Sequence, residues 1–151
     1  MTADERTRVI TLIAVVRSVA RQMVDELVAR LQAAGYPDTT PAQHLVFENL
    51  DPDGTRLTTL AQRAGVSRQA ITELVTGLQR SGYLELKPDP SDGRARLVHP
   101  TRKGAALLRV ALSEISELEA RWLESAAQAG LTVDLRQLLE SVAADQRSDI
   151  H

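Results

Sequence analysis

The sequence predicts a mainly α-helical protein that carries one small β-hairpin. Apolar residues recur at spacings of three and four over most of the chain, which is the period of amphipathic helices. Two short helical patterns are joined by a glycine turn, and two short alternating segments follow them at once. The 151 residues, 43% of them hydrophobic and 25% charged, can form one globular domain with its own core.

The first predicted helix covers residues 4–34 and ends at Gly35. One apolar row follows the helical period through its whole length, and a second row contains Leu12, Val15 and Val19. A helix with two apolar faces buries one against its own domain and requires another surface for the other. The sequence therefore predicts that this helix has a partner outside its own lobe.

A second helix is predicted over residues 41–50. Thr40 is a suitable N-cap, and Pro41 is favoured at the first helical position. The residues DPDG at 51–54 then have the composition of a turn.

The next segment has the pattern of a helix-turn-helix. Thr58 is the predicted cap of a short helix that ends at Ala64, and Gly65 permits the turn. Ser67 is the predicted cap of a second helix, which runs to Ser81. Many helical hairpins share this spacing, so the pattern is moderately specific by itself.

A basic hairpin follows the helix-turn-helix directly. The segments YLEL (83–86) and ARLV (95–98) alternate apolar and polar residues, as short strands do. The intervening KPDPSDGR contains two prolines and an Asp-Gly pair, and it predicts a loop with its tip at residues 91–94. A helix-turn-helix followed by such a hairpin predicts a winged helix.

Two further helices complete the predicted fold. Thr101 is the expected start of a long helix that reaches about Ala129, and Thr132 is the expected cap of the last one. The polar tail, 145–151, is expected to fray.

Charge is distributed unevenly along the chain. The net charge is −2, yet residues 55–105 contain nine Lys or Arg and four Asp or Glu, so this window carries +5 and the remainder −7. A basic middle between acidic ends is typical of a protein that binds a polyanion, although a solvated face with salt bridges gives the same composition.

Several classes of site are disfavoured by composition. The chain has no cysteine, which excludes disulfides and thiolate chemistry, and its three histidines lie too far apart in sequence for a metal site. No catalytic motif or cofactor-binding motif is present, so we expect no enzyme. The N-terminal residues lack the pattern of a signal peptide or membrane helix, and we expect a cytoplasmic protein.

Polar residues outside the apolar stripe of the second helix are candidates for reading DNA in the major groove. Arginine suits guanine and glutamine suits adenine, because each offers two matched hydrogen bonds. A serine at a helix N-terminus suits a phosphate. The candidate recognition residues are Ser67, Arg68, Gln69, Thr72 and Thr76.

The hairpin supplies a second set of candidates. An arginine at its tip is suited to the negative potential of a minor groove, and flanking cations neutralise phosphates. The candidate wing residues are Asp92, Gly93, Arg94 and Arg96, and the candidate phosphate contacts are Arg56, Arg102 and Lys103.

Two acidic residues are unusual near DNA. Asp92 either braces a nearby arginine such as Arg94 or serves as a turn residue before Gly93. Glu73 either accepts from a cytosine amine or turns back to an arginine of its own domain, and the second alternative is our expectation.

The segment LTTLAQRAGVSRQAITELVTGLQRSGYLELKPDPSDGRARLVHPTRKG resembles the winged-helix core of the multiple-antibiotic-resistance-regulator (MarR) family. The wing signature DPSDGRARLV…TRKG is its most specific part, and the flanking helices agree with the family pattern. The resemblance implies one MarR-like domain over 1–151, with a DNA-binding lobe at 38–100 and a dimerisation region formed by helices at 4–34 and 101–146.

By this resemblance the protein is a bacterial or archaeal homodimeric transcription regulator. A twofold pair of lobes would bind a pseudo-palindromic operator, most commonly to repress transcription. Relatives often bind small aromatic or anionic effectors between the dimer layer and the DNA-binding lobe, and the candidate lining residues here are Arg17, Arg21, His44 and Phe47. The alternative is a winged helix that binds another protein and no DNA.

Overall fold

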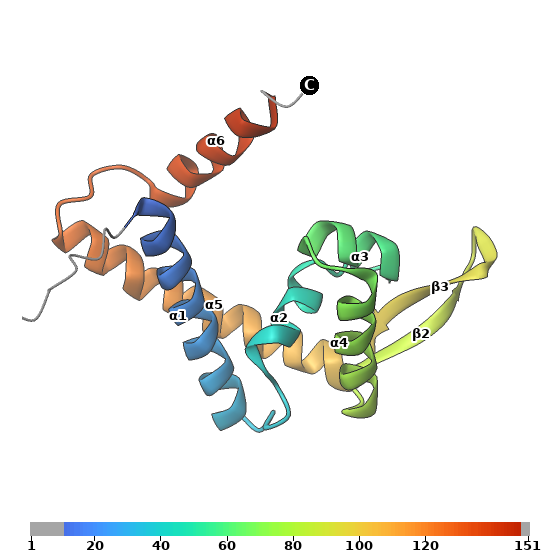
Figure 1. Ribbon diagram of the computed structural model, residues 1–151. Helices are drawn as coiled ribbons and strands as arrows, with labels where there is room; N and C mark the ends of the chain where they lie inside the picture. The colour runs from blue at the N-terminus through green and yellow to red at the C-terminus, as the bar shows by residue number, and fades with distance from the viewer. Residues whose placement is uncertain (1–10, 149–151) are drawn as a thin grey trace, which may run out of the picture. The chain divides into compact units, whose positions relative to one another are not determined.

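The computed structural model describes residues 11–148, with side chains to residue 144, and confirms a mainly helical fold with a small antiparallel sheet (Figure 1). The chain divides into two compact units between Glu114 and Ile115. The elements in order are α1 (Leu12–Ala33), α2 (Pro41–Glu48), β1 (Thr55–Arg56), α3 (Leu57–Ala64), α4 (Arg68–Arg80), β2 (Leu84–Asp89), β3 (Asp92–Pro100), α5 (Arg102–Gln128) and α6 (Leu135–Ser148).

Helix α1 begins later than the sequence predicted. Thr11 is extended, and its side chain accepts a hydrogen bond from the backbone N–H of Ala14, so it caps the helix. The prediction of one continuous helix from residue 4 is therefore wrong at Thr11, and residues 4–10 lie outside the described part of the chain. The helix ends as expected before Gly35, whose φ is 101°.

Helix α2 begins where the sequence predicted and ends earlier. Thr40 and Gln43 form a capping box, in which the Gln43 side chain accepts from the Thr40 backbone N–H at 3.1 Å. The helix ends at Glu48 rather than at residue 50, and Asn49 follows as its C-cap.

Helices α3 and α4 form the predicted helix-turn-helix. Gly65 ends α3 in the left-handed conformation with φ 65°, and the Ser67 hydroxyl accepts from the Ala70 N–H at 3.1 Å to cap α4. The cap predicted at Thr58 is wrong, because α3 already begins at Leu57. The residues before it form β1, a strand that the sequence did not reveal.

The strands form an antiparallel sheet in the order β1-β3-β2. Both strands of the hairpin are longer than predicted, and the chain turns at residues 90–91 rather than at 91–94. The Asp89 carboxylate accepts from both the backbone N–H and the hydroxyl of Ser91, which builds the turn before the Asp-Gly pair is reached. Gly93 lies in strand β3 and does not have a positive φ.

The core of the first unit joins the helix-turn-helix to the sheet. Ile71, Val75 and Leu78 form the predicted buried stripe of α4. They are buried together with residues from the neighbouring elements, and the opposite face of α4 remains available to solvent. The other fully buried side chains of this core include Val46, Leu60, Tyr83, Val98 and Leu107.

The end of α4 is joined closely to the start of α5. Thr101 donates its backbone N–H to the Tyr83 carbonyl at 3.0 Å and its hydroxyl to the Gly82 carbonyl at 2.6 Å. Lys103 donates to the Ser81 carbonyl at 2.7 Å, and its ammonium lies 4.3 Å from the centre of the Tyr83 ring. Gly104 is buried against the Tyr83 backbone, so this approach requires a residue without a side chain.

The second unit contains the end of α5 and helix α6. Asp134 caps α6 by accepting from the Gln137 N–H at 3.1 Å, so the cap predicted at Thr132 is wrong. Arg136 of α6 pairs with Glu119 of α5. The helix continues to Ser148, so the expected fraying from residue 145 is wrong as far as the description extends; 149–151 lie outside it.

We expect Gly104→Ala to destabilise the protein. Alanine is favoured over glycine in a helix by about 1 kcal/mol, but a Cβ at this position collides with the Tyr83 carbonyl oxygen, which cannot rotate away. Overpacking of this kind costs about 1–3 kcal/mol, and the collision should outweigh the helix propensity. Urea unfolding followed by circular dichroism measures the difference.

Gly93→Ala is the matched control, because no atom lies within 4 Å of a Cβ built there and φ is not positive. Its stability should change by less than about 0.5 kcal/mol. Equal stability of the Gly104→Ala variant and the parent protein would contradict the close packing at Tyr83.

Candidate nucleic-acid interface

The outer face of α4 carries the candidate recognition residues. Arg68, Gln69 and Thr72 are exposed, and Thr76 is half-buried one turn further along. Ser67 lies at the N-terminus of the same helix, where its hydroxyl already caps the Ala70 N–H. The structure thus places these five residues on one helix, with the N-terminal end the most accessible.

Hydrogen bonds within α4 limit what this face can offer. Thr72 donates its hydroxyl to the Arg68 carbonyl at 2.6 Å, and Thr76 donates to the Thr72 carbonyl at 2.7 Å. Gln69 donates from Nε2 to Glu73 Oε1 at 3.1 Å. The expectation that Glu73 pairs with an arginine is therefore wrong, because its partner is a glutamine one turn away on the same helix.

An ion pair joins strand β1 to the end of β2, where the wing turns. Asp89 is only 6% exposed, its Oδ2 accepts a hydrogen bond from Arg56 Nε at 2.7 Å, and the same oxygen lies 2.5 Å from Arg56 Nη2. The other carboxylate oxygen accepts from Ser91. Hydrogen bonds from the Ser91 hydroxyl and backbone, followed by that from Arg56, lower the pKa of Asp89 to about 2.

Asp92 has a mixed role. Its Oδ1 accepts from the backbone N–H of Arg94 at 3.1 Å, which is the local bond of a turn residue. Its Oδ2 lies 3.9 Å from Arg56 Nη2, so it also faces an arginine, though not the side chain of Arg94. Of the two sequence alternatives, the backbone bond is the shorter contact, and the wing brace is supplied by Asp89.

The recognition helix and the wing share one hollow on the surface. It has a volume of about 400 Å³ and is open to solvent. Four arginines surround it, and the only acid among its lining residues is Asp92. The lining residues are Arg56, Leu57, Thr58, Arg68, Asp92, Arg94, Ala95 and Arg96.

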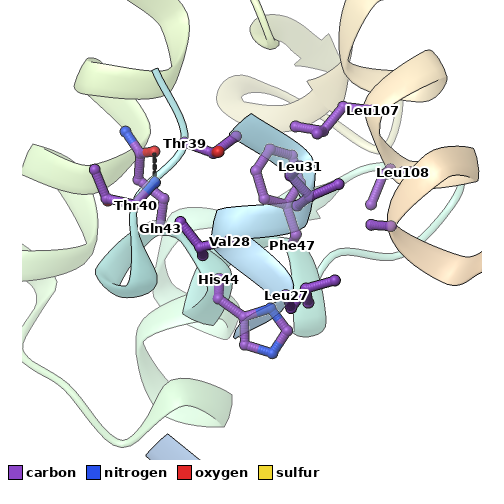
Figure 2. A pocket seen from close by; sticks show the side chains of 11 residues that line it. Leu27, Val28, Leu31, Thr39, Thr40, Gln43, His44, Phe47, Leu107 and Leu108 are labelled. Carbon is purple, nitrogen blue, oxygen red and sulfur yellow. Dashed lines mark hydrogen bonds between the residues drawn. The ribbon is translucent and has the colours of Figure 1, made fainter. Parts of the chain in front are cut away.

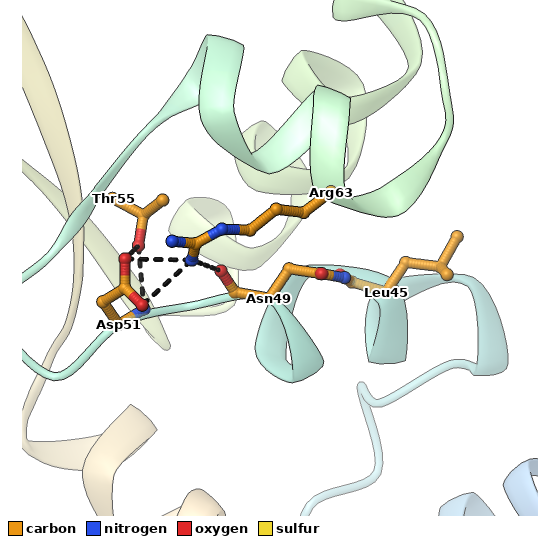
Figure 3. Close-up of polar contacts among 5 residues, drawn as sticks. All are labelled: Leu45, Asn49, Asp51, Thr55 and Arg63. Carbon is orange, nitrogen blue, oxygen red and sulfur yellow. Dashed lines mark hydrogen bonds and ion pairs between the residues drawn. The ribbon is translucent and has the colours of Figure 1, made fainter. Parts of the chain in front are cut away.

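Some basic residues between positions 55 and 105 bind acidic or carbonyl groups of the protein itself. Arg63 Nη1 donates to both carboxylate oxygens of Asp51 at 2.9 Å and to the Asn49 carbonyl at 3.0 Å (Figure 3). The bond from Arg63 lowers the pKa of Asp51, and Thr55 completes the cluster. Lys87 pairs with Glu85 at 2.9 Å. The Arg63 contacts tie α3 to the end of α2. Together with the Lys87–Glu85 pair, they leave fewer unpaired cations than the number of Lys and Arg residues in the sequence suggests.

The candidate phosphate contacts differ in whether their side chains already bond to other groups of the protein. Arg102 is exposed at the first turn of α5. Lys103 is exposed but bonds the end of α4, and Arg56 holds the wing through Asp89. Their roles toward phosphate remain predictions.

A second, apolar pocket lies between α1, α2 and the first part of α5 (Figure 2). Its volume of about 30 Å³ has room for about two water molecules. His44 and Phe47 line it as predicted, whereas Arg17 and Arg21 do not. The full lining is Leu27, Val28, Leu31, Thr39, Thr40, Gln43, His44, Phe47, Leu107, Leu108 and Ala111.

His44 is the one residue of this lining that can become cationic. It is 25% exposed, and its Nε2 lies 3.2 Å from Glu48 Oε2. The two arginines miss the lining because it is built by the C-terminal half of α1, where Leu27, Val28 and Leu31 are buried, whereas both arginines lie nearer its start.

Other kinds of site find no support in residues 11–148. No group of three or more His, Cys, Asp or Glu residues in this part is arranged to hold a metal ion. None of its helices is long and apolar enough to cross a membrane.

A helix-turn-helix followed by a hairpin, with arginines of both around one hollow, defines a winged-helix protein of the nucleic-acid-binding class. Residues 38–95 match the model of the MarR family. This match covers most of the winged-helix core and confirms the resemblance to this family that was found in the sequence. Regulators of this family are generally not enzymes.

Solved structures share this fold across almost the whole chain. CouR from Rhodococcus jostii RHA1, bound to p-coumaroyl-CoA, has a TM-score of 0.67 at 19% identity, covering 92% of this chain and 86% of its own. An S. aureus MepR–DNA complex has a TM-score of 0.69 at 16% identity, and the match covers 93% of this chain and 98% of that one. PcaV from Streptomyces coelicolor, in complex with its natural ligand, has a TM-score of 0.64 at 23% identity, and the match covers 99% of this chain and 98% of that one. No curated protein matches the sequence.

The sequence places Asp89 in the loop and Ser91 at its predicted tip, but it did not reveal the hydrogen bonds between them that shape the wing. An aspartate side chain that accepts from the backbone N–H two residues later is a common turn. The partner of Asp89 could not be found in this way, because Arg56 lies 33 residues earlier in the chain.

We expect Asp89→Asn to lower stability at neutral pH and to matter less in acid. The folded pKa of about 2 lies below the ordinary 3.8, so ionised Asp89 favours the folded state above about pH 4. That contribution is lost as the pH falls toward 2. Urea unfolding at pH 7 and pH 2.5 should show the gap between the variant and the parent protein narrowing in acid.

Asp53→Asn, at an exposed position in the turn before β1, removes the same charge and should change stability little at either pH. If the difference in unfolding free energy between Asp89→Asn and the parent protein stays constant from pH 7 to pH 2.5, the carboxylate does not hold the wing through its charge.

Proposed function

We propose that the protein is a cytoplasmic, sequence-specific regulator that binds double-stranded DNA as a homodimer, most commonly to repress transcription. The main support for this proposal is the shared hollow, where Arg68 of the recognition helix lies on one surface with Arg94 and Arg96 of the wing. Cations on two elements that converge on one side can bind one duplex, whereas cations on opposite sides cannot.

In this proposal α4 enters the major groove, led by its exposed N-terminal end. Arg68 and Gln69 reach base edges, and the wing places Arg94 in the neighbouring minor groove. Arg96 and Arg102, both exposed, neutralise phosphates. Arg56 and Lys103 have internal partners and contribute mainly by holding the wing and the end of α4 in position.

The dimer is supported by apolar side chains that neither unit buries. Leu12 is 78% exposed and Ile13 is 76% exposed at the start of α1, and both belong to the predicted dimerisation region. In the second unit Leu138, Leu139 and Val142 of α6 are about half exposed. Exposed apolar side chains of this kind are typical of a surface that another chain covers, and a twofold pair of lobes matches a pseudo-palindromic operator.

The apolar pocket supports control by a small aromatic or anionic effector. Leucine, valine and phenylalanine side chains suit an aromatic ring, and His44 can accept an acidic group. The cavity is too small for such a compound as it stands, so binding requires α2 to move. Gln43 lines the pocket and lies against Gly77 of α4, so a movement of α2 reaches the recognition helix directly.

Selection of bound sequences from a random duplex pool should yield a pseudo-palindrome with half-sites about one helical turn apart. On the selected site, Arg94→Ala should weaken binding about tenfold and lower the salt slope by about one. Fluorescence anisotropy at several salt concentrations measures both quantities.

Arg109→Ala is the control, because it removes the same charge from an exposed position on α5 outside the hollow. It should bind nearly as the parent protein does. Selected sequences without twofold symmetry would contradict the dimer, and a protein that binds no duplex at low salt would instead be the interaction module considered from the sequence.

Aromatic carboxylates such as 4-hydroxybenzoate and p-coumarate should release the operator. Phe47→Ala should blunt this response and leave DNA affinity within about threefold, because Phe47 lines the pocket and not the hollow. Phe47→Leu, which keeps most of the apolar volume, should respond more nearly like the parent protein. Anisotropy that does not change with any compound, together with unchanged thermal stability, would argue against an effector site here.

A further inference from the structure

Glu73 on helix α4 is not an isolated charge. Its Oε1 accepts the hydrogen bond from Gln69 Nε2 at 3.1 Å, one helical turn apart, and both side chains are exposed on the face of α4 proposed to read bases. The inference below rests on the proposed DNA binding and concerns how that face selects a base.

The bond to Glu73 determines which way round the Gln69 amide lies. The oxygen and nitrogen ends of an amide have almost the same shape, and only their hydrogen-bonding partners distinguish them. An ionised carboxylate can accept hydrogen bonds but cannot donate them, so the nitrogen must face Glu73. The Gln69 oxygen is therefore directed away from Glu73, and one N–H of the amide remains free.

This remaining pair of groups matches adenine. Adenine offers a donor at N6 and an acceptor at N7 in the major groove, and an amide oxygen with its adjacent N–H satisfies both. An amide turned the other way would direct donors toward the base edge, where guanine offers two acceptors. The orientation of Gln69 thus decides between the two purines.

The candidate readers that follow Gln69 along α4 do not supply a competing donor. The hydroxyl hydrogen of Thr72 is bonded to the Arg68 carbonyl, so Thr72 offers a base only an acceptor and a methyl group. Thr76 is bonded in the same way to Thr72. Among the candidate readers after Arg68, the free N–H of Gln69 is therefore the main donor, and its placement matters for the choice of base.

We propose that Glu73 is a positioning residue: it fixes the Gln69 amide so that Gln69 selects adenine. Its negative charge also disfavours binding to any phosphate backbone, which lowers affinity for random DNA. Through both effects Glu73 raises the ratio of specific to non-specific binding.

The test is a double-mutant cycle on the selected operator, with each base pair of one half-site substituted in turn. Gln69→Ala should identify one base pair at which an adenine preference of about tenfold is lost. Glu73→Gln should reduce the preference at that same base pair to about threefold or less, because a glutamine partner accepts either orientation of Gln69. The double variant should be no worse there than Gln69→Ala alone.

Glu85→Gln is the matched control, because it removes one negative charge from the wing, where the Glu85 side chain is 44% exposed. It should raise affinity for random DNA without changing base preference. Circular dichroism melts verify that all variants fold, which is expected because both α4 positions are exposed.

The results separate this inference from the function on which it rests. A parent protein that binds no duplex at low salt refutes the proposed function. If the parent protein binds, additive effects of Gln69→Ala and Glu73→Gln, or an unchanged adenine preference in Glu73→Gln, overturn the positioning role. Loss of a cytosine preference at another base pair in Glu73→Gln would also overturn it, because Glu73 would then read a base itself.

Discussion

The proposed DNA-binding surface is braced by one ion pair between distant parts of the chain. Arg56 lies in β1, just before the helix-turn-helix, and Asp89 lies where the wing turns, so their contact fixes the hairpin relative to α3. Strand β1 also pairs with β3, with Thr55 opposite Val98. Because Asp89 is almost fully buried and accepts three hydrogen bonds beside its ion pair with Arg56, loosening it would leave an unpaired buried charge. Arg56 itself lines the hollow that joins Arg68 to Arg94, so the same side chain braces the wing and borders this surface.

Positive charge in this lobe has two uses, and the structure separates them. Arg56, Arg63 and Lys103 bond to groups of their own lobe, where they hold the wing, the α2–α3 connection and the end of α4. Arg68 and Arg94 line the hollow and extend from exposed positions. A count of charges along the sequence cannot tell these groups apart, because the distinction depends on which acids and carbonyl groups the fold brings close. The effective cationic surface is consequently smaller and more localised than a net charge of +5 over residues 55–105 indicates.

Local signals in the sequence predicted most of the fold. The caps at Thr40 and Ser67 and the left-handed turn at Gly65 involve neighbours within four residues, so the sequence alone reveals them. Strand β1 was missed because two residues have no period, and only their pairing with β3 defines them as a strand. The wing tip was misplaced because Asp-Gly is a strong turn signal, yet Asp89 builds a turn earlier with help from Arg56. The candidate site followed the same division: its helix was predicted well, whereas the brace of its wing was not.

Helix α1 shows how one element can serve both a dimer and a pocket. Leu27, Val28 and Leu31 in its C-terminal half are at most 6% exposed and pack within the first unit, while Leu12 and Ile13 at its start remain more than three-quarters exposed. The second apolar face predicted from the sequence is therefore concentrated near one end of the helix. A partner that covers this end leaves the pocket at the other end to be built by residues of a single protomer. In the proposed dimer each subunit would then hold its own effector beside its own recognition helix.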